Sequence, residues 1–256
     1  MGELAFVGLG LGDERGLSER ARDALARADR VFAEEYTAVA PAGTLERLAG
    51  AIGRPIERLG RAEVEAEGPV LAALASVPRV AFLVVGDPFA ATTHVALRLA
   101  AERAGHRWSY YPNASILTAA AGFLGLMAYR FGRTVSLPLP SPGFAPTSPL
   151  EQVAANRDRG LHSLLLLDLD PTAGRFLTAG AALTILRERD PAERWLRGTD
   201  RAAVAARVGR DDAAGFFGPV DRLRSVDFGA PLHAVVLLAP ELHFQEEAAL
   251  ARFRIA

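Results

Sequence analysis

Two amino acids are missing from this chain of 256 residues: it contains no cysteine and no lysine, so all 29 of its basic residues are arginine. Without cysteine there is no disulfide framework, no thiolate nucleophile and no cysteine-ligated zinc or iron–sulfur site. Without lysine there is no Schiff-base or pyridoxal chemistry and no phosphate-binding lysine of a P-loop. These absences exclude several large enzyme classes before any motif is considered.

The chain also has little net charge and no long apolar run. Its formal net charge is −1, which gives no electrostatic reason to expect nucleic acid or anionic lipid as a partner. Residues 1–30 lack the basic start and apolar stretch of a secretory signal. The longest uncharged stretch, 108–129, contains Pro112 and Asn113 and fits a buried helix better than a membrane span. We therefore expect a cytoplasmic protein that binds neither nucleic acid nor membrane.

What the chain does contain is a pair of glycine turns, each following a short apolar run. Gly-Leu-Gly-Leu-Gly-Asp at 8–13 follows the run 4–7, and Gly-Asp-Pro-Phe-Ala-Ala-Thr-Thr-His at 86–94 follows the run 80–85. Such runs are typical of buried parallel strands, and each turn leads into a helical pattern. The two corners are therefore expected at the carboxyl edge of one parallel sheet, where open α/β folds bind their ligands.

The first turn does not fit a dinucleotide cofactor. In a G-x-G-x-x-G motif the third glycine is replaced by Asp13 when the count starts at Gly8, and by Arg15 when it starts at Gly10. An acidic residue there is also unfavourable beside a pyrophosphate. A cofactor without phosphates remains, and the carboxylates of Asp13 and Asp87 are compatible with a sulfonium or ammonium group. S-adenosylmethionine is the common cofactor of this kind, although glycine–aspartate turns are often only structural.

The remaining pattern alternates strands and helices and changes style after Arg130. In the first half we expect Ser18 to cap a helix with an apolar face, and Thr92 or Thr93 to cap the helix after the second turn. A proline-rich loop is expected at 137–150. The second half, with more antiparallel character, is expected to contain helices at 150–159 and 173–189, strands at 163–168, 202–208 and 232–238, and a terminal helix. We predict α/β domains at 1–112 and 113–256, with the boundary between 112 and 134.

Five segments resemble, in order, the diphthine synthase family, and together they span nearly the whole chain. They are Gly8–Asp13, Val84–His94, Asn113–Ile116, Asn156–Ser163 and Pro231–His233. The Gly-Asp-Pro corner alone marks the wider superfamily of tetrapyrrole-methylase-like enzymes. Its extension through Thr-Thr-His, together with Asn-Ala-Ser-Ile, is much narrower. The segment 137–150 matches the family poorly.

The resemblance implies a fold and an activity. The family has two α/β domains of the tetrapyrrole methylase type, with S-adenosylmethionine in the inter-domain cleft, usually in a homodimer. Its members methylate the amino group of the 3-amino-3-carboxypropyl chain on the modified histidine of translation elongation factor 2, which gives diphthine in diphthamide biosynthesis. Archaeal members add three methyl groups, and eukaryotic members also form a methyl ester.

The resemblance also implies which residues bind the cofactor. The family's cofactor contacts correspond here to Leu11, Asp87, Ala90, Ser115, Ile116, Leu167, Val208 and His233. Asp87 would bind a ribose hydroxyl or the methionine amino group, although an aspartate before proline also caps its own turn. Ala90 departs from the family, which more often has glycine there. His233 would contact the cofactor through its backbone, although a buried, hydrogen-bonded histidine is a serious alternative.

Methyl transfer from a sulfonium requires neither a metal nor a dedicated general base, because solvent can take the proton from the amine. His94 is the one candidate for a proton acceptor, with a helix-capping or surface role as the alternative. The other histidines, His106, His162 and His243, have no paired metal-ligand spacing, so no metal site is expected. Two further functions stay open: a tetrapyrrole or corrinoid methyltransferase on the same fold, and a non-catalytic protein that binds S-adenosylmethionine.

Overall fold

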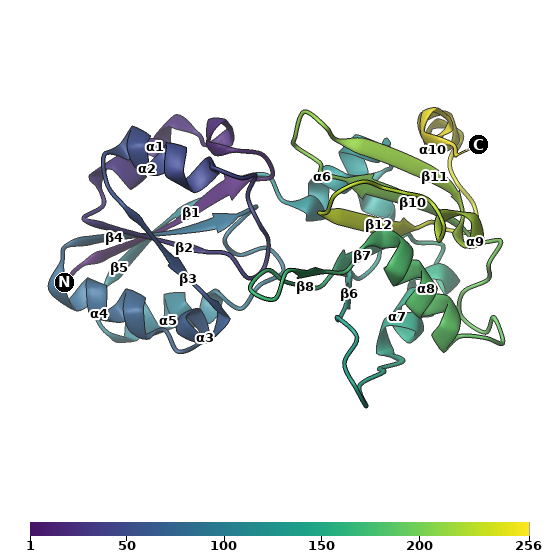
Figure 1. Cartoon of the computed structure of the whole chain (residues 1–256), viewed down its shortest axis with the longest axis horizontal. Coiled ribbons are helices and arrows are strands. Elements are labelled where there is room, and N and C mark those ends of the chain that lie inside the picture. The colour runs from purple at the N-terminus through teal and green to yellow at the C-terminus, as the bar shows by residue number, and fades with distance from the viewer. Residues whose placement is uncertain (256) are drawn as a thin grey trace. The chain divides into compact units, whose positions relative to one another are not determined.

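The computed structural model describes residues 1–255, which form two compact units (Figure 1). Unit 1 is Met1–Ser115 and unit 2 begins at Ile116. The predicted domains, 1–112 and 113–256, stay a prediction. Among residues 1–255, no helix is both long enough and apolar enough to cross a membrane.

Unit 1 is a five-stranded parallel sheet with helices on both faces, as the alternating pattern predicted. The strand order is β3-β2-β4-β1-β5. The strands are β1 (Glu3–Gly10), β2 (Arg30–Glu34), β3 (Ile56–Leu59), β4 (Arg79–Val85) and β5 (Arg107–Tyr111). Figure 1 shows two helices on one face, α1 (Glu19–Arg27) and α2 (Thr44–Ile52), and three on the other, α3 (Arg61–Glu65), α4 (Gly68–Ser76) and α5 (Val95–Arg103).

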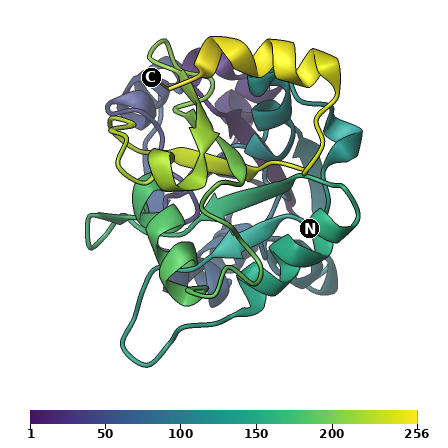
Figure 2. The ribbon, with the colours of Figure 1, turned by 90° about the vertical axis from the view of Figure 1, so that its right-hand side faces the viewer.

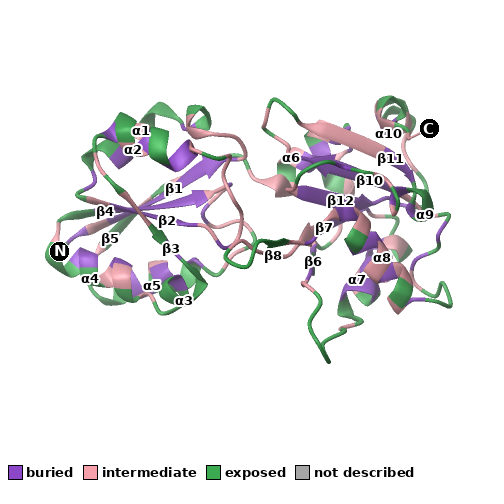
Figure 3. Cartoon of the chain, viewed as in Figure 1, coloured by how far each residue is buried: buried purple, intermediate pink, exposed green. Residues whose placement is uncertain are grey.

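The apolar run of β1 forms a strand because both of its faces are buried. Leu4 and Phe6 pack on the face of α4 and α5, and Ala5 and Val7 pack on the face of α1 and α2. Figure 3 shows the same burial along the central strands. A strand covered on both faces is apolar at successive positions rather than at alternate ones.

Of the two helix caps predicted in unit 1, one is confirmed and the other is wrong. Ser18 caps α1, where its hydroxyl accepts a hydrogen bond from the Ala21 amide at 3.2 Å. Neither Thr92 nor Thr93 caps α5, because that helix begins after His94, whose side chain makes no capping bond. Both threonines lie in the turn before the helix, so the preference of threonine for the N-cap position did not predict the cap.

Unit 2 is a mixed sheet with the order β11-β10-β12-β7-β6, antiparallel except for the β6–β7 pair. This confirms the predicted antiparallel character of the second half. The strands are β6 (Val135–Leu137), β7 (Ser163–Leu167), β10 (Arg201–Ala206), β11 (Ala214–Pro219) and β12 (His233–Leu237). One face packs on α7 (Ser148–Asp158), α8 (Ala179–Arg189) and α9 (Val220–Leu223), and the other on α6 (Ile116–Leu124) and α10 (Phe244–Leu250) (Figure 2).

Two expectations for unit 2 are wrong in detail, and one strand was missed. The helix expected at 173–189 begins only at Ala179, because a small hairpin of β8 (Leu169–Asp170) and β9 (Arg175–Phe176) precedes it. The strand expected at 202–208 ends at Ala206, because Arg207 takes a left-handed backbone conformation with φ 52° and turns the chain. Strand β11 was not predicted at all.

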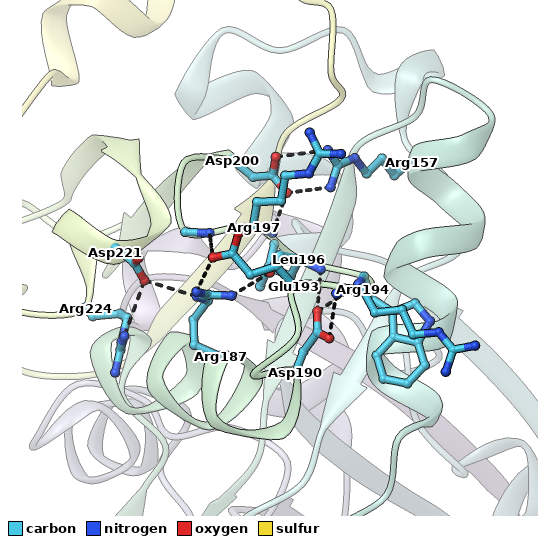
Figure 4. A network of polar contacts seen from close by, with 12 residues as sticks. Arg157, Arg187, Asp190, Glu193, Arg194, Leu196, Arg197, Asp200, Asp221 and Arg224 are labelled. Carbon is cyan, nitrogen blue, oxygen red and sulfur yellow. Dashed lines mark hydrogen bonds and ion pairs between the residues drawn. The ribbon is translucent and has the colours of Figure 1, made fainter.

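The loop between α8 and β10 is held by a buried carboxylate. Asp190 is 2% exposed and accepts hydrogen bonds at 2.8 Å from the backbone amides of Arg194, Trp195 and Leu196 (Figure 4). Burial alone would raise the pKa of Asp190, but the three amides hold it below its usual value. Arg187 adds a hydrogen bond to the Leu196 carbonyl at 2.7 Å. This network fixes the path by which the chain enters β10.

Candidate functional site

The two glycine turns lie side by side at the carboxyl ends of neighbouring strands, as predicted. Gly10 ends β1 and Gly86 follows β4, and the two residues exchange backbone hydrogen bonds of 3.1 and 2.8 Å. Both have positive φ, 81° and 83°, which favours glycine. The helices that follow the two strands, α1 and α5, cover opposite faces of the sheet. This is the switch point at which open α/β sheets bind ligands.

Gly8 makes the close approach of the two turns possible. A Cβ at this position would lie 2.7 Å from the Gly86 carbonyl oxygen and 2.8 Å from Cβ of Asn113. Both neighbours are fixed by the backbone, so no side-chain movement could relieve the clash. Glycine is therefore required here by space alone.

Asn113, which follows β5, ties a third segment to the same corner. Its side-chain amide donates to the Gly8 carbonyl at 2.9 Å and to the Gly16 carbonyl at 3.1 Å. Its Oδ1 accepts from the Ala114 amide at 2.8 Å. The sequence predicted Asn113 as part of a family motif and of the turn before the next helix, but not its contacts with the first glycine turn. Its position directly after a strand and before a helix was the signal for a side chain that organises a turn.

Asp87 lies half-buried in the second turn, and three donors from the protein surround its carboxylate. Oδ1 accepts from the Phe89 amide at 3.0 Å, while Oδ2 accepts from the Tyr110 hydroxyl at 2.6 Å and from the Asn113 amide at 3.2 Å. The bond to Phe89 is the turn-capping contact that was the alternative to cofactor binding. Partial burial, and then the hydrogen bond and negative charge of Asp87, raise the pKa of Tyr110 to about 12.

The first turn is less available to a ligand than its sequence suggested. Leu11 follows β1 in a bend and is half-buried. Asp13 caps the short 3-10 helix Glu14–Gly16, and its Oδ2 accepts from Nε of Arg15 at 2.9 Å. Burial would raise the pKa of Asp13, but the backbone amide and guanidinium of Arg15 lower it overall. Its charge is already compensated within the turn, which leaves Asp87 as the acidic group of the corner.

The rest of the second turn is strained and holds an unpaired hydroxyl. Ala90 is half-buried, and its amide donates to the Asp87 carbonyl at 3.2 Å. Ala91 has φ 55°, an uncommon conformation for a residue with a side chain. The hydroxyl oxygen of Thr92 is buried and has no hydrogen-bond partner among residues 1–255. Strain and an unsatisfied polar atom together are typical of a ligand-binding turn.

His94 is buried rather than at the surface, and although it occupies the N-cap position of α5, its side chain makes no capping bond to residues 1–255. Neither alternative to a catalytic role therefore describes its side chain. The residue is 1% exposed, and its ring packs edge-on against Phe82 at 5.1 Å between centroids. Nδ1 lies 2.8 Å from the Pro88 carbonyl oxygen and Nε2 lies 3.4 Å from the Tyr36 hydroxyl. The carbonyl must accept, so Nδ1 carries the hydrogen and Nε2 accepts. Burial lowers the pKa of His94.

Three of the predicted cofactor residues of unit 2 meet at one edge of its sheet. Leu167 ends β7, Val208 lies two residues beyond β10, and His233 begins β12. The pairing places Leu166 opposite Ala234 and Ala206 opposite His233. Leu167 and Val208 are both half-buried.

The two remaining predicted residues lie at the start of α6. Ser115 directly precedes this helix and Ile116 is its first residue. Both are half-buried, and Ile116 packs against the same apolar cluster as Val208.

The side chain of His233 is used by the fold. The residue is 8% exposed, its Nδ1 accepts from the Ala179 amide at 3.2 Å, and its Nε2 donates to the Ala230 carbonyl at 3.1 Å. The first contact satisfies an amide at the N-terminus of α8, which has no partner within the helix. Burial lowers the pKa of His233. Only the backbone of this residue is left to meet a ligand.

Arg207, which sequence reasoning missed, connects the turn of Val208 to the segment before β12. Its Nη1 donates to the Phe228 carbonyl at 2.8 Å and to the Ala230 carbonyl at 2.5 Å. Nε forms an ion pair with Asp212 at 2.6 Å. An arginine after a strand gives no sequence signal for such a role, because most arginines are exposed.

Comparisons with known proteins agree with this geometry. Residues 3–224 match the family model described as tetrapyrrole (corrin/porphyrin) methylases. The chain is 38% identical to diphthine synthase of Methanothermobacter thermautotrophicus over 246 residues, covering 95% of this chain and 92% of the relative. It is 36% identical to diphthine synthase of Methanococcus maripaludis over 249 residues, covering 96% and 97%. A crystal structure of diphthine synthase superposes with a TM-score of 0.87 at 35% identity, covering 98% and 96% of the two chains.

Proposed function

The chain belongs to the diphthine synthase family of the tetrapyrrole methylases, and we propose that it methylates the 3-amino-3-carboxypropyl-histidine of translation elongation factor 2 with S-adenosylmethionine as the donor. It is a methyltransferase of diphthamide biosynthesis. The observation that carries the proposal is a similarity that extends over 95% of the chain and 92% of a relative at 38% identity. Such similarity involves both units and not only the glycine corner.

The corner of unit 1 fits S-adenosylmethionine better than a phosphate-bearing cofactor. Its uncompensated charged group is the carboxylate of Asp87, which suits an ammonium or a hydroxyl and repels a phosphate. Arg15, the cation nearest in sequence to the first turn, is already paired with Asp13. The buried hydroxyl of Thr92 offers a further hydrogen-bonding atom to a polar ligand.

S-adenosylmethionine would supply an electrophilic methyl group on a sulfonium. We propose that the residues that contact it are Leu11, Asp87, Ala90, Ser115, Ile116, Leu167, Val208 and His233. Asp87 would accept one hydrogen bond from a hydroxyl or from the amino group, and His233 and Ala90 would contribute backbone groups. The aliphatic side chains would pack against the adenosyl group. Orientation of donor and acceptor by such contacts is worth up to about 7–11 kcal/mol in well-oriented reactions.

The acceptor amine must be the free base, because an ammonium has no lone pair. Its nitrogen forms the new bond to the methyl carbon, the carbon–sulfur bond breaks, and the amine releases its proton. His94 is poorly placed to take that proton, since it is 1% exposed and both ring nitrogens already face protein partners. We propose that solvent takes it. A homodimer and a cytoplasmic location are proposed on the family resemblance alone.

The experiment is to incubate the purified protein with S-adenosylmethionine and elongation factor 2 that carries the aminocarboxypropyl histidine, and to weigh the modified peptide by mass spectrometry. A gain of methyl groups on that residue is expected, and their number separates the archaeal from the eukaryotic pattern. No gain, with cofactor binding measured in the same sample, would contradict the proposal and favour a tetrapyrrole substrate.

A matched pair of variants makes the assay specific to the proposed site. Asp87→Ala is expected to reduce methyl transfer by at least about tenfold, because a charge-assisted hydrogen bond to the ligand is lost. Asp23→Ala removes an exposed carboxylate on α1 and is expected to leave the activity unchanged. Equal activities of the Asp87→Ala and Asp23→Ala variants would show that Asp87 does not contribute to the proposed site.

A further inference from the structure

Tyr110 reaches the corner of unit 1 from a strand that none of the sequence motifs includes. It lies on β5, the edge strand, in register with Phe6 of β1. Its ring is 41% exposed and packs against Phe89 with centroids 5.1 Å apart. Its hydroxyl donates to Oδ2 of Asp87 at 2.6 Å, which is the shortest of the three contacts to that carboxylate. Tyr110, on β5, thus bonds to the carboxylate of Asp87, which lies in the turn after β4.

The hydrogen bonds of Asp87 leave little choice in how its carboxylate is oriented. A carboxylate has about four acceptor positions, two on each oxygen. Tyr110 and the Asn113 amide occupy both positions on Oδ2, and the Phe89 amide occupies one on Oδ1. One position on Oδ1 remains. The backbone amides set the place of the carboxylate, and within residues 1–255 the Tyr110 hydroxyl is the one side-chain donor to it and sets its rotation.

We propose that Tyr110 is a positioning residue for S-adenosylmethionine binding: its hydroxyl fixes the carboxylate of Asp87 so that Oδ1 presents a single acceptor position to one donor of the cofactor. This inference rests on the proposed function. Tyr110 acts through Asp87 and is not a catalytic residue. A hydrogen bond to an ionised acceptor is stronger than one to a neutral acceptor. Removing the Tyr110 hydroxyl should therefore change the orientation of the Asp87 carboxylate more than the packing of the exposed ring.

The test uses the full chain and the variant Tyr110→Phe, which keeps the ring and removes only the hydroxyl. Calorimetric titration with S-adenosylmethionine is expected to give a dissociation constant about three- to tenfold larger. In the methylation assay KM for S-adenosylmethionine is expected to rise by the same factor. KM for elongation factor 2 and kcat at saturating cofactor are expected to stay within twofold of the unchanged protein. A general loss of structure would not separate the parameters in this way.

Two further variants show whether the effect passes through Asp87. In an Asp87→Ala background, Tyr110→Phe is expected to change the dissociation constant by less than twofold, because there is no carboxylate to orient. Trp108→Phe alters a neighbouring aromatic residue of β5 whose indole donates to Glu102 rather than to Asp87. It is expected to leave cofactor binding unchanged.

The outcomes separate this inference from the proposed function. If the unchanged protein binds S-adenosylmethionine and Tyr110→Phe binds it equally well, the inference is overturned and the function stands. Equal losses with and without Asp87 would also overturn it, because Tyr110 would then act through packing. If the unchanged protein does not bind S-adenosylmethionine, both fail.

Discussion

The two units build their candidate contact residues in different ways. In unit 1 the strands are parallel, so the turns after β1, β4 and β5 all lie at the same edge of the sheet. In unit 2 the strands are mainly antiparallel, so Leu167 ends one strand and Val208 follows another, while His233 begins a third. The first arrangement leaves a visible pattern of glycine turns in the sequence, and the second leaves none.

The units also differ in what holds these segments in place. In unit 1 the contacts come from short side chains, Asn113 and Asp87, which bond to neighbouring turns. In unit 2 a long arginine, Arg207, and a buried histidine, His233, reach across to other segments. We infer that unit 1 tolerates almost no change in its turns, whereas unit 2 depends on a few side chains at its strand ends that bond to other segments.

The largest effect is expected from Gly8→Ala in unit 1. The new Cβ would lie 2.7 Å from the Gly86 carbonyl oxygen, so the two turns must separate. We expect affinity for S-adenosylmethionine to fall by more than about 100-fold and the free energy of unfolding by about 3 kcal/mol. Calorimetric titration and urea denaturation measure the two effects.

The control for this change is Gly50→Ala in α2 of the same unit. A Cβ there meets no atom of the described residues within 4 Å. Alanine is favoured over glycine inside a helix, so a gain of about 0.5–1 kcal/mol is expected with unchanged cofactor affinity. If Gly8→Ala behaved like this control, the tight corner described for unit 1 would be wrong.

The second effect concerns stability in unit 2 alone. Asp190→Ala would leave three backbone amides, of which that of Leu196 is buried, without their acceptor, and we expect a loss of about 3 kcal/mol in the free energy of unfolding. The loop enters β10 at the end opposite Val208, so affinity for S-adenosylmethionine should not change. Glu188→Ala removes an exposed carboxylate from α8 and serves as the control. A loss below 1 kcal/mol would contradict the role of Asp190.

The contrast between the units explains how far sequence reasoning could go. Leu4–Val7 and Val80–Val85 were recognised as strands because each is an unbroken apolar run. Strand β3, Ile56–Leu59, was missed because a four-residue edge strand with two adjacent charged residues resembles a loop. Strand β11 pairs with β10 and bonds to the segment at Arg254 and Ile255, and local composition does not predict pairing between segments far apart in the sequence.

The same reasoning applies to the candidate site. Asp87 could be proposed from its place in a glycine turn. Two of its donors, Tyr110 on β5 and Asn113 after that strand, lie far from it in the sequence and could not be predicted. Leu167 and Val208 are ordinary apolar residues, and only a resemblance to a family could single them out. The contacts of Tyr110 and Arg207 and the burial of His94 depend on which segments the fold brings together, so the sequence did not predict them.

The third effect is a loss of stability in mild acid, and both units contribute to it. His94, His162 and His233 are buried, and burial is the main cause that lowers the pKa of each below the usual 6.5. Each uses one ring nitrogen as an acceptor: His94 from Tyr36, His162 from Ala239 and His233 from Ala179. Protonation of the ring would destroy these contacts.

The sign of the pH dependence follows from the lowered pKa values. Below about pH 6.5 the unfolded chain binds protons that the folded chain does not, so stability falls as the pH is lowered. Each histidine contributes a slope of up to about 1.4 kcal/mol per pH unit between its folded pKa and 6.5, and none above pH 7. Urea denaturation between pH 5 and 8 measures the slope. A flat profile would contradict the prediction.

The smallest effect is expected from His94, and it tests whether unit 1 also depends on a distant side chain. His94→Phe keeps the ring against Phe82 but removes the donor to the Pro88 carbonyl. The turn from Asp87 to Ala90 loses a restraint, so we expect about tenfold weaker binding of S-adenosylmethionine. In His94→Asn the side-chain amide takes the place of Nδ1, and part of the affinity should return although the core is less well filled.

Phe82→Leu separates this restraint from core packing. It disturbs the same cluster but leaves the hydrogen bond between His94 and Pro88 in place. It should therefore lower the melting temperature with little change in cofactor affinity. If asparagine restored nothing, or if Phe82→Leu weakened binding as much as His94→Phe, the effect of His94 would be packing alone. The turn of unit 1 would then be held by Asp87 and Asn113 without help from the interior, and the contrast with unit 2 would be sharper.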